Sequence, residues 1–184
     1  MVMKCPSCKT GNLMHSHLED MLPCCTCNQC SGHWLLLTDY LRWKDQAELS
    51  STSSHEDAQI EVQDTKQALV CPVSGVLMLK YRISGQTSHR LDLSPGVNGI
   101  WLDKGEWELL KQEGLIDKLN HIFTAPWQRK LRAEQTKDTL SAVYAKQFGE
   151  EDYAKLQEVR QWLEQNPKKA YMLAYLVADN PYSA

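Results

Sequence analysis

The apolar residues of this chain follow two periodicities, which predict different secondary structures. Residues 13–22 and 76–93 each have room for a β-hairpin, and Ser84-Gly85-Gln86 gives the second of them a turn. After each of these segments, and again beyond residue 125, apolar residues recur every three or four positions, as they do along helices. The pattern therefore predicts small β units followed by helices.

The last third of the chain carries the clearest helical pattern. Gly149 separates two apolar stripes, and the acidic residues directly after it suit the positive end of a new helix. Asn166 is typical of an N-cap ahead of Pro167, so a third helix is expected to begin there. The stripes comprise Leu140, Val143, Tyr144 and Phe148 before the break, and Tyr153, Leu156, Val159 and Leu163 after it. We expect three helices that pack as a small bundle.

Composition and charge divide the chain further. Its 184 residues are 42% apolar, which is enough for one ordinary domain or a few small ones. Residues 45–67 are acidic, serine-rich and poor in apolar side chains, so they cannot bury enough surface to offset the entropy of ordering them. We interpret this segment as a linker between units at residues 1–44 and 68–122, with a helical C-terminal region at residues 123–184.

The two units resemble each other in sequence. Three short segments of the first unit, which begin at Cys5, Gly11 and Gly32, recur in the second unit from Cys71, Gly75 and Gly99. They read Cys-Pro-Ser-Cys, Gly-Asn-Leu-Met and Gly-His-Trp-Leu in the first unit, and Cys-Pro-Val-Ser, Gly-Val-Leu-Met and Gly-Ile-Trp-Leu in the second. This repetition indicates a duplicated supersecondary unit.

The cysteines point to a metal site in the first unit. Cys5-x-x-Cys8 and Cys27-x-x-Cys30 have the pairing and the separation typical of a zinc site. Four thiolates make a closed tetrahedral site, which is structural and not catalytic because no position is left open for water. We therefore expect one structural Zn²⁺ per chain.

Other residues nearby compete for the ion. Cys24 and Cys27 form a second C-x-x-C pair. The repeat, however, aligns Cys24 and Cys25 with Leu91 and Asp92, which lie in the strand expected before the second pair of ligand positions. These two cysteines are then ordinary strand residues or, alternatively, a redox-sensitive thiol pair. Three histidines compete less well because four thiolates already complete the shell; they are His15, His17 and His33.

The second unit has lost most of these ligands. Cys71 is kept, but Ser74, Ser94 and Val97 occupy the other three positions. Serine is a poor zinc ligand and valine is none, so this unit is expected to bind no metal and to stay folded without it. Packing must then hold it together, through Leu77, Leu79, Ile100, Trp101 and Trp107.

The ligand spacing and the Gly-x-Trp-Leu ending resemble the prokaryotic transcription factor IIB-type zinc finger family of small zinc ribbons. The first unit supplies the four ligands of that family but departs from its usual ending, whereas residues 98–106 of the second unit nearly match the ending. The resemblance implies two ribbon-like units, the second metal-free, before an all-helical region. The fold class expected is therefore α+β.

Charge and motifs limit the possible functions. The formal net charge of −3 gives no general attraction to nucleic acid or to anionic membranes, and no apolar run reaches the roughly 18 residues that span a bilayer. No catalytic motif is present, and Asp103 and Glu106 are interpreted as helix-capping residues, so we expect no enzyme activity. Without a secretory segment before Cys5, the expected location is the cytoplasm.

Two functions remain. In the first, the protein is a non-catalytic adaptor that uses its ribbons and helical region to bind an unidentified protein partner or a second copy of itself. Candidate contacts are its exposed aromatic residues, drawn from Trp43, Trp127, Trp162, Tyr171 and Tyr182. In the second, it is a nucleic-acid-binding transcription regulator that uses the ribbon and the basic segment 129–137, with Arg129, Lys130, Arg132 and Lys137.

Overall fold

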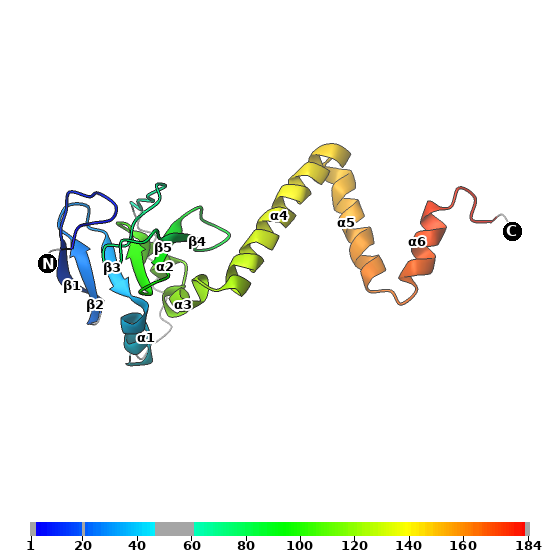
Figure 1. The fold of residues 1–184 in the computed structure, drawn as a ribbon. Coiled ribbons are helices and arrows are strands. Elements are labelled where there is room, and N and C mark those ends of the chain that lie inside the picture. The colour runs from blue at the N-terminus through cyan, green and yellow to red at the C-terminus, as the bar shows by residue number, and fades with distance from the viewer. Residues whose placement is uncertain (1–2, 20, 47–60, 183–184) are drawn as a thin grey trace. The chain divides into compact units, whose positions relative to one another are not determined.

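The computed structural model describes residues 3–19, 21–46 and 61–182. It divides the chain into two compact units, residues 1–133 and 134–184, and every strand that the structure describes lies in the first (Figure 1). A sheet followed by helices confirms the predicted α+β class. Most of the predicted linker, at positions 47–60, lies outside the described residues.

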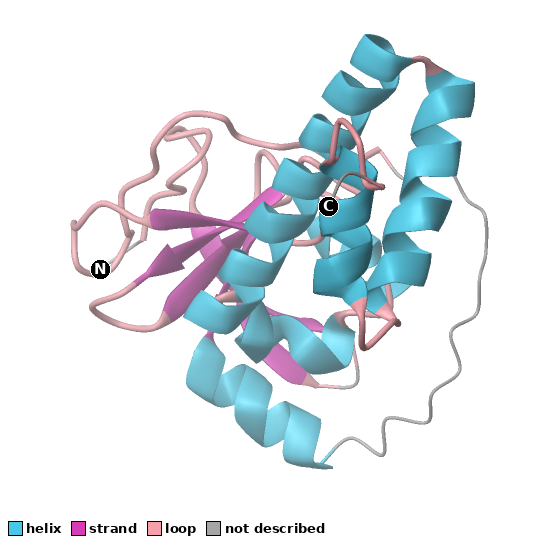
Figure 2. Ribbon diagram, turned by 90° about the vertical axis from the view of Figure 1, so that its right-hand side faces the viewer, coloured by secondary structure: helices cyan, strands magenta, loops and turns pink. Residues whose placement is uncertain are grey.

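Among the described residues, six strands form a single antiparallel sheet with the order β1-β2-β3-β6-β5-β4, drawn in magenta (Figure 2). The strands are β1 (Leu13–Leu18), β2 (Leu22–Cys27), β3 (His33–Leu36), β4 (Leu79–Arg82), β5 (Arg90–Ser94) and β6 (Gly99–Leu102). Both predicted hairpins form, as β1–β2 and β4–β5. Each sequence unit thus supplies three neighbouring strands, and the two sets meet in the middle.

The middle of the sheet is the β3–β6 pair. Trp34 lies opposite Trp101, and Leu35 lies opposite Ile100. Two glycines flank this pair, and a side chain on either would collide with a ring: a Cβ on Gly32 would lie 2.4 Å from the Trp101 indole, and a Cβ on Gly99 would lie 2.0 Å from the Trp34 indole. Each glycine therefore makes room for the tryptophan of the opposite unit.

Alternation along β3 and β6 separates two apolar clusters. Successive strand residues point to opposite faces, so Leu35 and Ile100 enter the larger cluster while Trp34 and Trp101 enter the smaller one. The larger cluster comprises Leu18, Leu22, Cys24, Leu35, Tyr40, Trp43, Ile83, Leu91, Leu93, Ile100, Leu102, Trp107, Leu109, Leu110, Leu115, Leu119 and Ile122. The smaller comprises Cys5, Leu13, Cys25, Cys27, Trp34, Leu69, Cys71, Met78 and Trp101.

Short helices close the larger cluster. They are α1 (Leu37–Gln46), α2 (Glu106–Gln112), the 3-10 turn η1 (Ile116–Lys118) and α3 (Leu119–Ile122). Tyr40 of α1 donates a hydrogen bond to the Ile116 carbonyl at 2.6 Å, and Trp43 packs edge-on against Trp107 at 6.0 Å. Helices from the two sequence units therefore share one core.

The packing predicted for residues 68–122 is partly wrong. Ile100, Trp101 and Trp107 are buried, as expected, but Leu77 and Leu79 are 55% and 47% exposed. Leu79 opens β4, an edge strand of the sheet, where a side chain has neighbours on one side only. The residues that do fill this part of the core, Ile83, Leu91 and Leu110, lie on and around β4, β5 and α2.

The last described part of the predicted linker lies against the sheet unit. Residues 61–67 have no regular secondary structure, yet Val62 packs on the larger cluster and Gln63 N–H donates to the Lys104 carbonyl at 2.9 Å. We call residues 61–67 the strap. Gly105 has φ +86°, and a Cβ there would lie 2.6 Å from the Glu61 carbonyl oxygen, so the close approach of the strap favours glycine.

Three helices follow the sheet: α4 (Ala125–Phe148), α5 (Glu150–Glu164) and α6 (Lys169–Val177). The predicted break at Gly149 is present, with φ +87°, and three acidic residues occupy the first turn of α5. The expected bundle interior is not found, because Leu163 is the one buried residue among positions 134–182. Most of the predicted stripe residues face solvent.

The central pairing generates a stability prediction. Trp101 is fully buried where the strands of residues 13–36 and 79–102 meet, so Trp101→Ala should lower the free energy of unfolding of residues 1–133 by about 3–5 kcal/mol. Denaturant unfolding followed by tryptophan fluorescence measures this loss. Trp162→Ala is the matched control because Trp162 is 56% exposed, and a similar loss in that variant would contradict the assignment.

Candidate metal centre

Two turns bring four thiols together. Cys5 and Cys8 lie in the turn before β1, whereas Cys27 ends β2 and Cys30 lies in the turn before β3. Because β1 and β2 pair with Leu13 opposite Cys27, the two turns lie at the same end of the hairpin. The structure thus places all four predicted ligands in one cluster.

The spacing of the sulfurs suits one tetrahedral ion. Cys5 and Cys30 Sγ are 3.6 Å apart, Cys8 and Cys27 Sγ are 3.7 Å apart, and all four sulfurs lie within 4.8 Å of one another. A tetrahedron with Zn–S bonds of about 2.3 Å has edges of about 3.8 Å. The cluster therefore has the dimensions of a four-thiolate zinc site.

Backbone N–H groups surround the sulfurs. Cys8 N–H donates to Cys5 Sγ at 3.4 Å, Gly11 N–H donates to Cys8 Sγ at 3.3 Å, and Gln29 N–H donates to Cys27 Sγ at 3.4 Å. Such hydrogen bonds favour the ionised thiolate, which is the form that binds a metal. At Gly11 a Cβ would lie 2.3 Å from Cys27 Sγ, so this position must stay small.

The thiols differ in acidity. Burial raises the pKa of the Cys5 thiol strongly and that of Cys30 to about 11. Burial opposes ionisation of Cys8 too, but hydrogen bonds from Gly11, Thr10 and neighbouring cysteines outweigh it and lower its pKa to about 6. Four thiolates at such close range repel one another, so a cation is needed to hold all four ionised.

Residues 4–46 match the model of the transcription factor zinc-finger family. This segment is a zinc ribbon of that family. The match ends with α1 and does not reach β4–β6 or the helices that follow. No curated protein and no solved structure matches the chain.

The zinc ribbon provides a site for one structural Zn²⁺ ion. Cys5, Cys8, Cys27 and Cys30 would hold it, and their four thiolates fill a tetrahedral shell. The ion would supply a cross-link between the two turns, because Cys5 and Cys8 belong to one and Cys27 and Cys30 to the other. With all four positions taken by protein, the ribbon site leaves no place for a reacting water.

The other residues that the sequence offered as zinc ligands lie outside the group of four thiols. Cys24 and Cys25 are adjacent in β2, so their side chains point to opposite faces, Cys24 into the larger cluster and Cys25 into the smaller. Burial raises the pKa of both thiols, which disfavours a reactive pair. His33 instead shares a 3.0 Å hydrogen bond with Thr26, and burial lowers the pKa of its imidazole.

The turn that follows Cys71 repeats part of the backbone hydrogen bonding of the turn that follows Cys5. Cys71 N–H donates to the Val76 carbonyl, just as Cys5 N–H donates to the Gly11 carbonyl. Likewise, Gly75 N–H donates to the Cys71 carbonyl, and Lys9 N–H donates to the Cys5 carbonyl. Burial opposes ionisation of Cys71, but hydrogen bonds from Ser74, Ser94 and Val73 lower the pKa of its thiol. A degenerate repeat without the metal site of the zinc ribbon stays a prediction for this segment.

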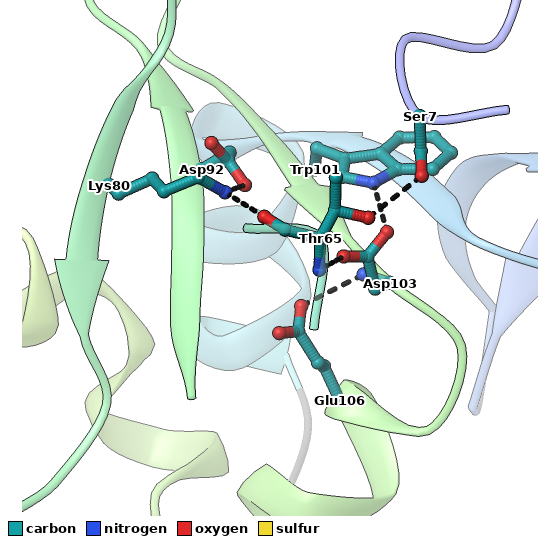
Figure 3. A network of polar contacts seen from close by, with 7 residues as sticks. All are labelled: Ser7, Thr65, Lys80, Asp92, Trp101, Asp103 and Glu106. Atoms are coloured by element: carbon teal, nitrogen blue, oxygen red, sulfur yellow. Dashed lines mark hydrogen bonds and ion pairs between the residues drawn. The ribbon is translucent and has the colours of Figure 1, made fainter. Parts of the chain in front are cut away.

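A polar network connects the zinc ribbon to the second segment (Figure 3). Ser7, which lies between Cys5 and Cys8, shares a 2.9 Å hydrogen bond with Thr65 of the strap. Thr65 N–H in turn donates to Asp103 at 2.6 Å. Asp103 also accepts from the Trp101 indole N–H at 2.8 Å, and its own N–H donates to Glu106 at 2.8 Å. The sequence predicted Asp103 and Glu106 as helix-capping residues, but the N-cap of α2 is Gly105 and no side chain caps that helix. The strap was not predicted, because nothing in the composition of residues 61–67 marks them as ordered.

The first prediction for this centre is its metal content. Protein dialysed against a mild chelator should keep one tightly bound zinc per chain, and changing Cys5, Cys8, Cys27 or Cys30 to Ser should release it. Elemental analysis measures the stoichiometry. Cys24→Ser and Cys25→Ser are the controls and should keep the ion; zinc loss in Cys24→Ser together with retention in Cys27→Ser would contradict the ligand set.

The second prediction concerns the shared sheet. We expected residues 68–122 to stay folded without metal, but β6 pairs with β3 of the zinc ribbon and both tryptophans share one cluster. Structural zinc contributes an apparent free energy of about 10–16 kcal/mol in small zinc domains, so strong chelation should unfold residues 1–133 cooperatively. Hydrogen exchange at Ile100 and Leu102 tests this, and protection that survives zinc removal would contradict it.

Proposed function

We propose that the protein is a non-catalytic adaptor that binds another protein through its helical region, with zinc in a structural role. The observation that carries this proposal is the apolar surface of residues 134–182, where Leu163 alone is buried among the described residues. Its exposed large residues include Leu140, Val143, Tyr144, Phe148, Leu156, Val159, Trp162, Tyr171, Leu173, Tyr175, Leu176, Val177 and Tyr182.

Physical chemistry makes such a surface unusual for an unpartnered chain. Helical stability in proteins comes mainly from packing of an apolar face, and isolated helices shorter than about 12–15 residues, such as α6, are marginal in water. Contiguous exposed apolar residues mark interaction surfaces in soluble proteins. Trp162, Tyr171 and Tyr182 are 56%, 81% and 82% exposed, and tryptophan and tyrosine are enriched in interface hot spots.

Further features support a binding role over catalysis. The ribbon site is closed, and Asp103 is engaged by the Trp101 indole and the strap instead of facing an open cleft. No helix among the described residues is both long and apolar enough to cross a membrane. All seven cysteines are free thiols, and the reducing cytoplasm that we propose as the location would keep them so.

The alternative is a nucleic-acid-binding regulator. The segment 129–137 at the start of α4 supports it, since Arg129, Lys130, Arg132 and Lys137 are exposed there. Against it stands the overall charge of −3, because neutralising several phosphates requires a larger cluster of cations.

One experiment tests the adaptor function. The full chain carrying Leu156→Ser and Trp162→Ser, both on exposed positions of α5, should lose capture of the partner that wild-type protein retains from its native cell extract. Lys155→Ser with Glu158→Ser changes exposed polar positions of the same helix and should keep it. Equal capture by both variants would contradict the assignment of α5 as a binding surface.

Nucleic-acid titration separates the two functions. Random DNA or RNA at about 50 mM salt should bind weakly at best, because few phosphates can be neutralised. Fluorescence anisotropy measures this. Tight binding that falls steeply by about 200 mM salt and is abolished by Arg129→Ala with Arg132→Ala would establish the regulator instead.

A further inference from the structure

A second group of metal-ligating side chains lies in the half of the sheet unit that the family match does not cover. Asp64 comes from the strap, His89 from the segment before β5, and Glu106 from the first residue of α2. One ligand atom from each of these residues lies within 4.8 Å of the other two. None of the three is a ligand of the ribbon site.

Two polar atoms in this group have no partner. Glu106 is 1% exposed; its Oε2 accepts from Asp103 N–H at 2.8 Å, but its Oε1 is buried without a hydrogen-bond partner. Nδ1 of His89 is also buried without one. Buried polar atoms are nearly always satisfied because leaving them unpaired costs desolvation energy. Both atoms therefore indicate a missing contact at this place.

The surrounding charge points to a cation. Asp92 and Asp103 are buried near Glu106, and the charged partner of Asp92 is Lys80, whose Nζ lies 2.7 Å from Asp92 Oδ2. Lys80 also donates to the Thr65 carbonyl, so its donors are already shared (Figure 3). Burial raises the pKa of Glu106 well above its usual value, and the nearby carboxylates of Asp103, Asp64 and Asp92 add to this. A positive ion bound there would instead favour the ionised carboxylate of Glu106.

We propose that Asp64, His89 and Glu106 bind one divalent transition-metal ion, separate from the ribbon zinc. An imidazole nitrogen with two carboxylate oxygens suits ions such as Zn²⁺, Mn²⁺, Fe²⁺ and Co²⁺ better than Mg²⁺ or Ca²⁺, which prefer oxygen ligands alone. Bonds of about 2.0–2.2 Å place neighbouring ligand atoms about 3–4 Å apart, and in the structure the three ligand atoms lie within 4.8 Å of one another. Asp64 and His89 are partly exposed, so water completes the shell.

The ion would fasten the strap to the sheet unit. Asp64 is flanked by Gln63, which donates to Lys104, and by Thr65, which bonds to Asp103 and to Ser7 of the zinc knuckle. A metal at Asp64 joins the strap to α2 through Glu106 and to the segment before β5 through His89. The second ion is therefore a cross-link in the part of the unit that has lost the ribbon thiols.

Cobalt titration tests the proposal on the full chain with zinc in the ribbon. Co²⁺ at a nitrogen–oxygen site gives weak visible bands, whereas thiolate ligation adds intense charge-transfer bands, so the spectrum reports which site is filled. We expect one weak-band equivalent per chain and a rise in the melting temperature with added Co²⁺. No spectral change up to about 1 mM Co²⁺, or thiolate bands alone, would overturn the proposal.

Two variants and two controls assign the ligands. Glu106→Gln keeps an oxygen to accept from Asp103 N–H, and Asp64→Asn lies on the irregular strap, so at least one should fold. Each should weaken Co²⁺ binding at least tenfold and remove the melting shift. Glu108→Gln, exposed on the same helix, and His17→Ala, exposed on β1, should bind as wild type; unchanged binding in Glu106→Gln and Asp64→Asn would overturn the ligand assignment.

Discussion

The pairing of β3 with β6 is the interaction on which the sheet unit depends. It places Trp34 against Trp101 across the centre of the sheet, and each ring lies where the other segment has a glycine. Without this pair, residues 13–36 and 79–102 would be two separate three-stranded sheets, and each would bury less apolar surface than the joined sheet does. With it, helices from both segments close a single interior, and the zinc ribbon becomes one half of a larger structure.

The zinc ribbon could be predicted from the sequence because its chemistry is local. Cys5-x-x-Cys8 and Cys27-x-x-Cys30 set the ligands, the hairpin between them sets their distance, and little else is needed to bring the sulfurs together. The burial of Trp101 was also predictable from its match with Trp34. Leu79 was misplaced because sequence alternation does not reveal which strand lies at the edge of a sheet, and Leu77 lies before that strand, in an isolated bridge with Val70.

Features that depend on contacts between distant segments could not be predicted. The strap has the acidic composition of a linker, yet Thr65 bonds to Ser7 and Asp103, and its order comes from these partners and not from its own residues. The grouping of Asp64, His89 and Glu106 has the same origin, since no spacing rule joins three residues on three different segments. The exposed stripes of α4 and α5 carry the reverse lesson, because helical periodicity identifies an apolar face but not what covers it.

The central position of β3–β6 also has a kinetic consequence. These strands are the last of their respective hairpin units, so closing the sheet pairs residues that lie far apart in the sequence, such as Trp34 and Trp101. Such non-local pairing slows folding, because the entropy of closing the loop is lost before the contacts form. That entropy grows only with the logarithm of loop length, and doubling the loop costs about 0.6 kcal/mol. The number of residues between β3 and β6 therefore has little effect on stability, provided that the two strands still meet.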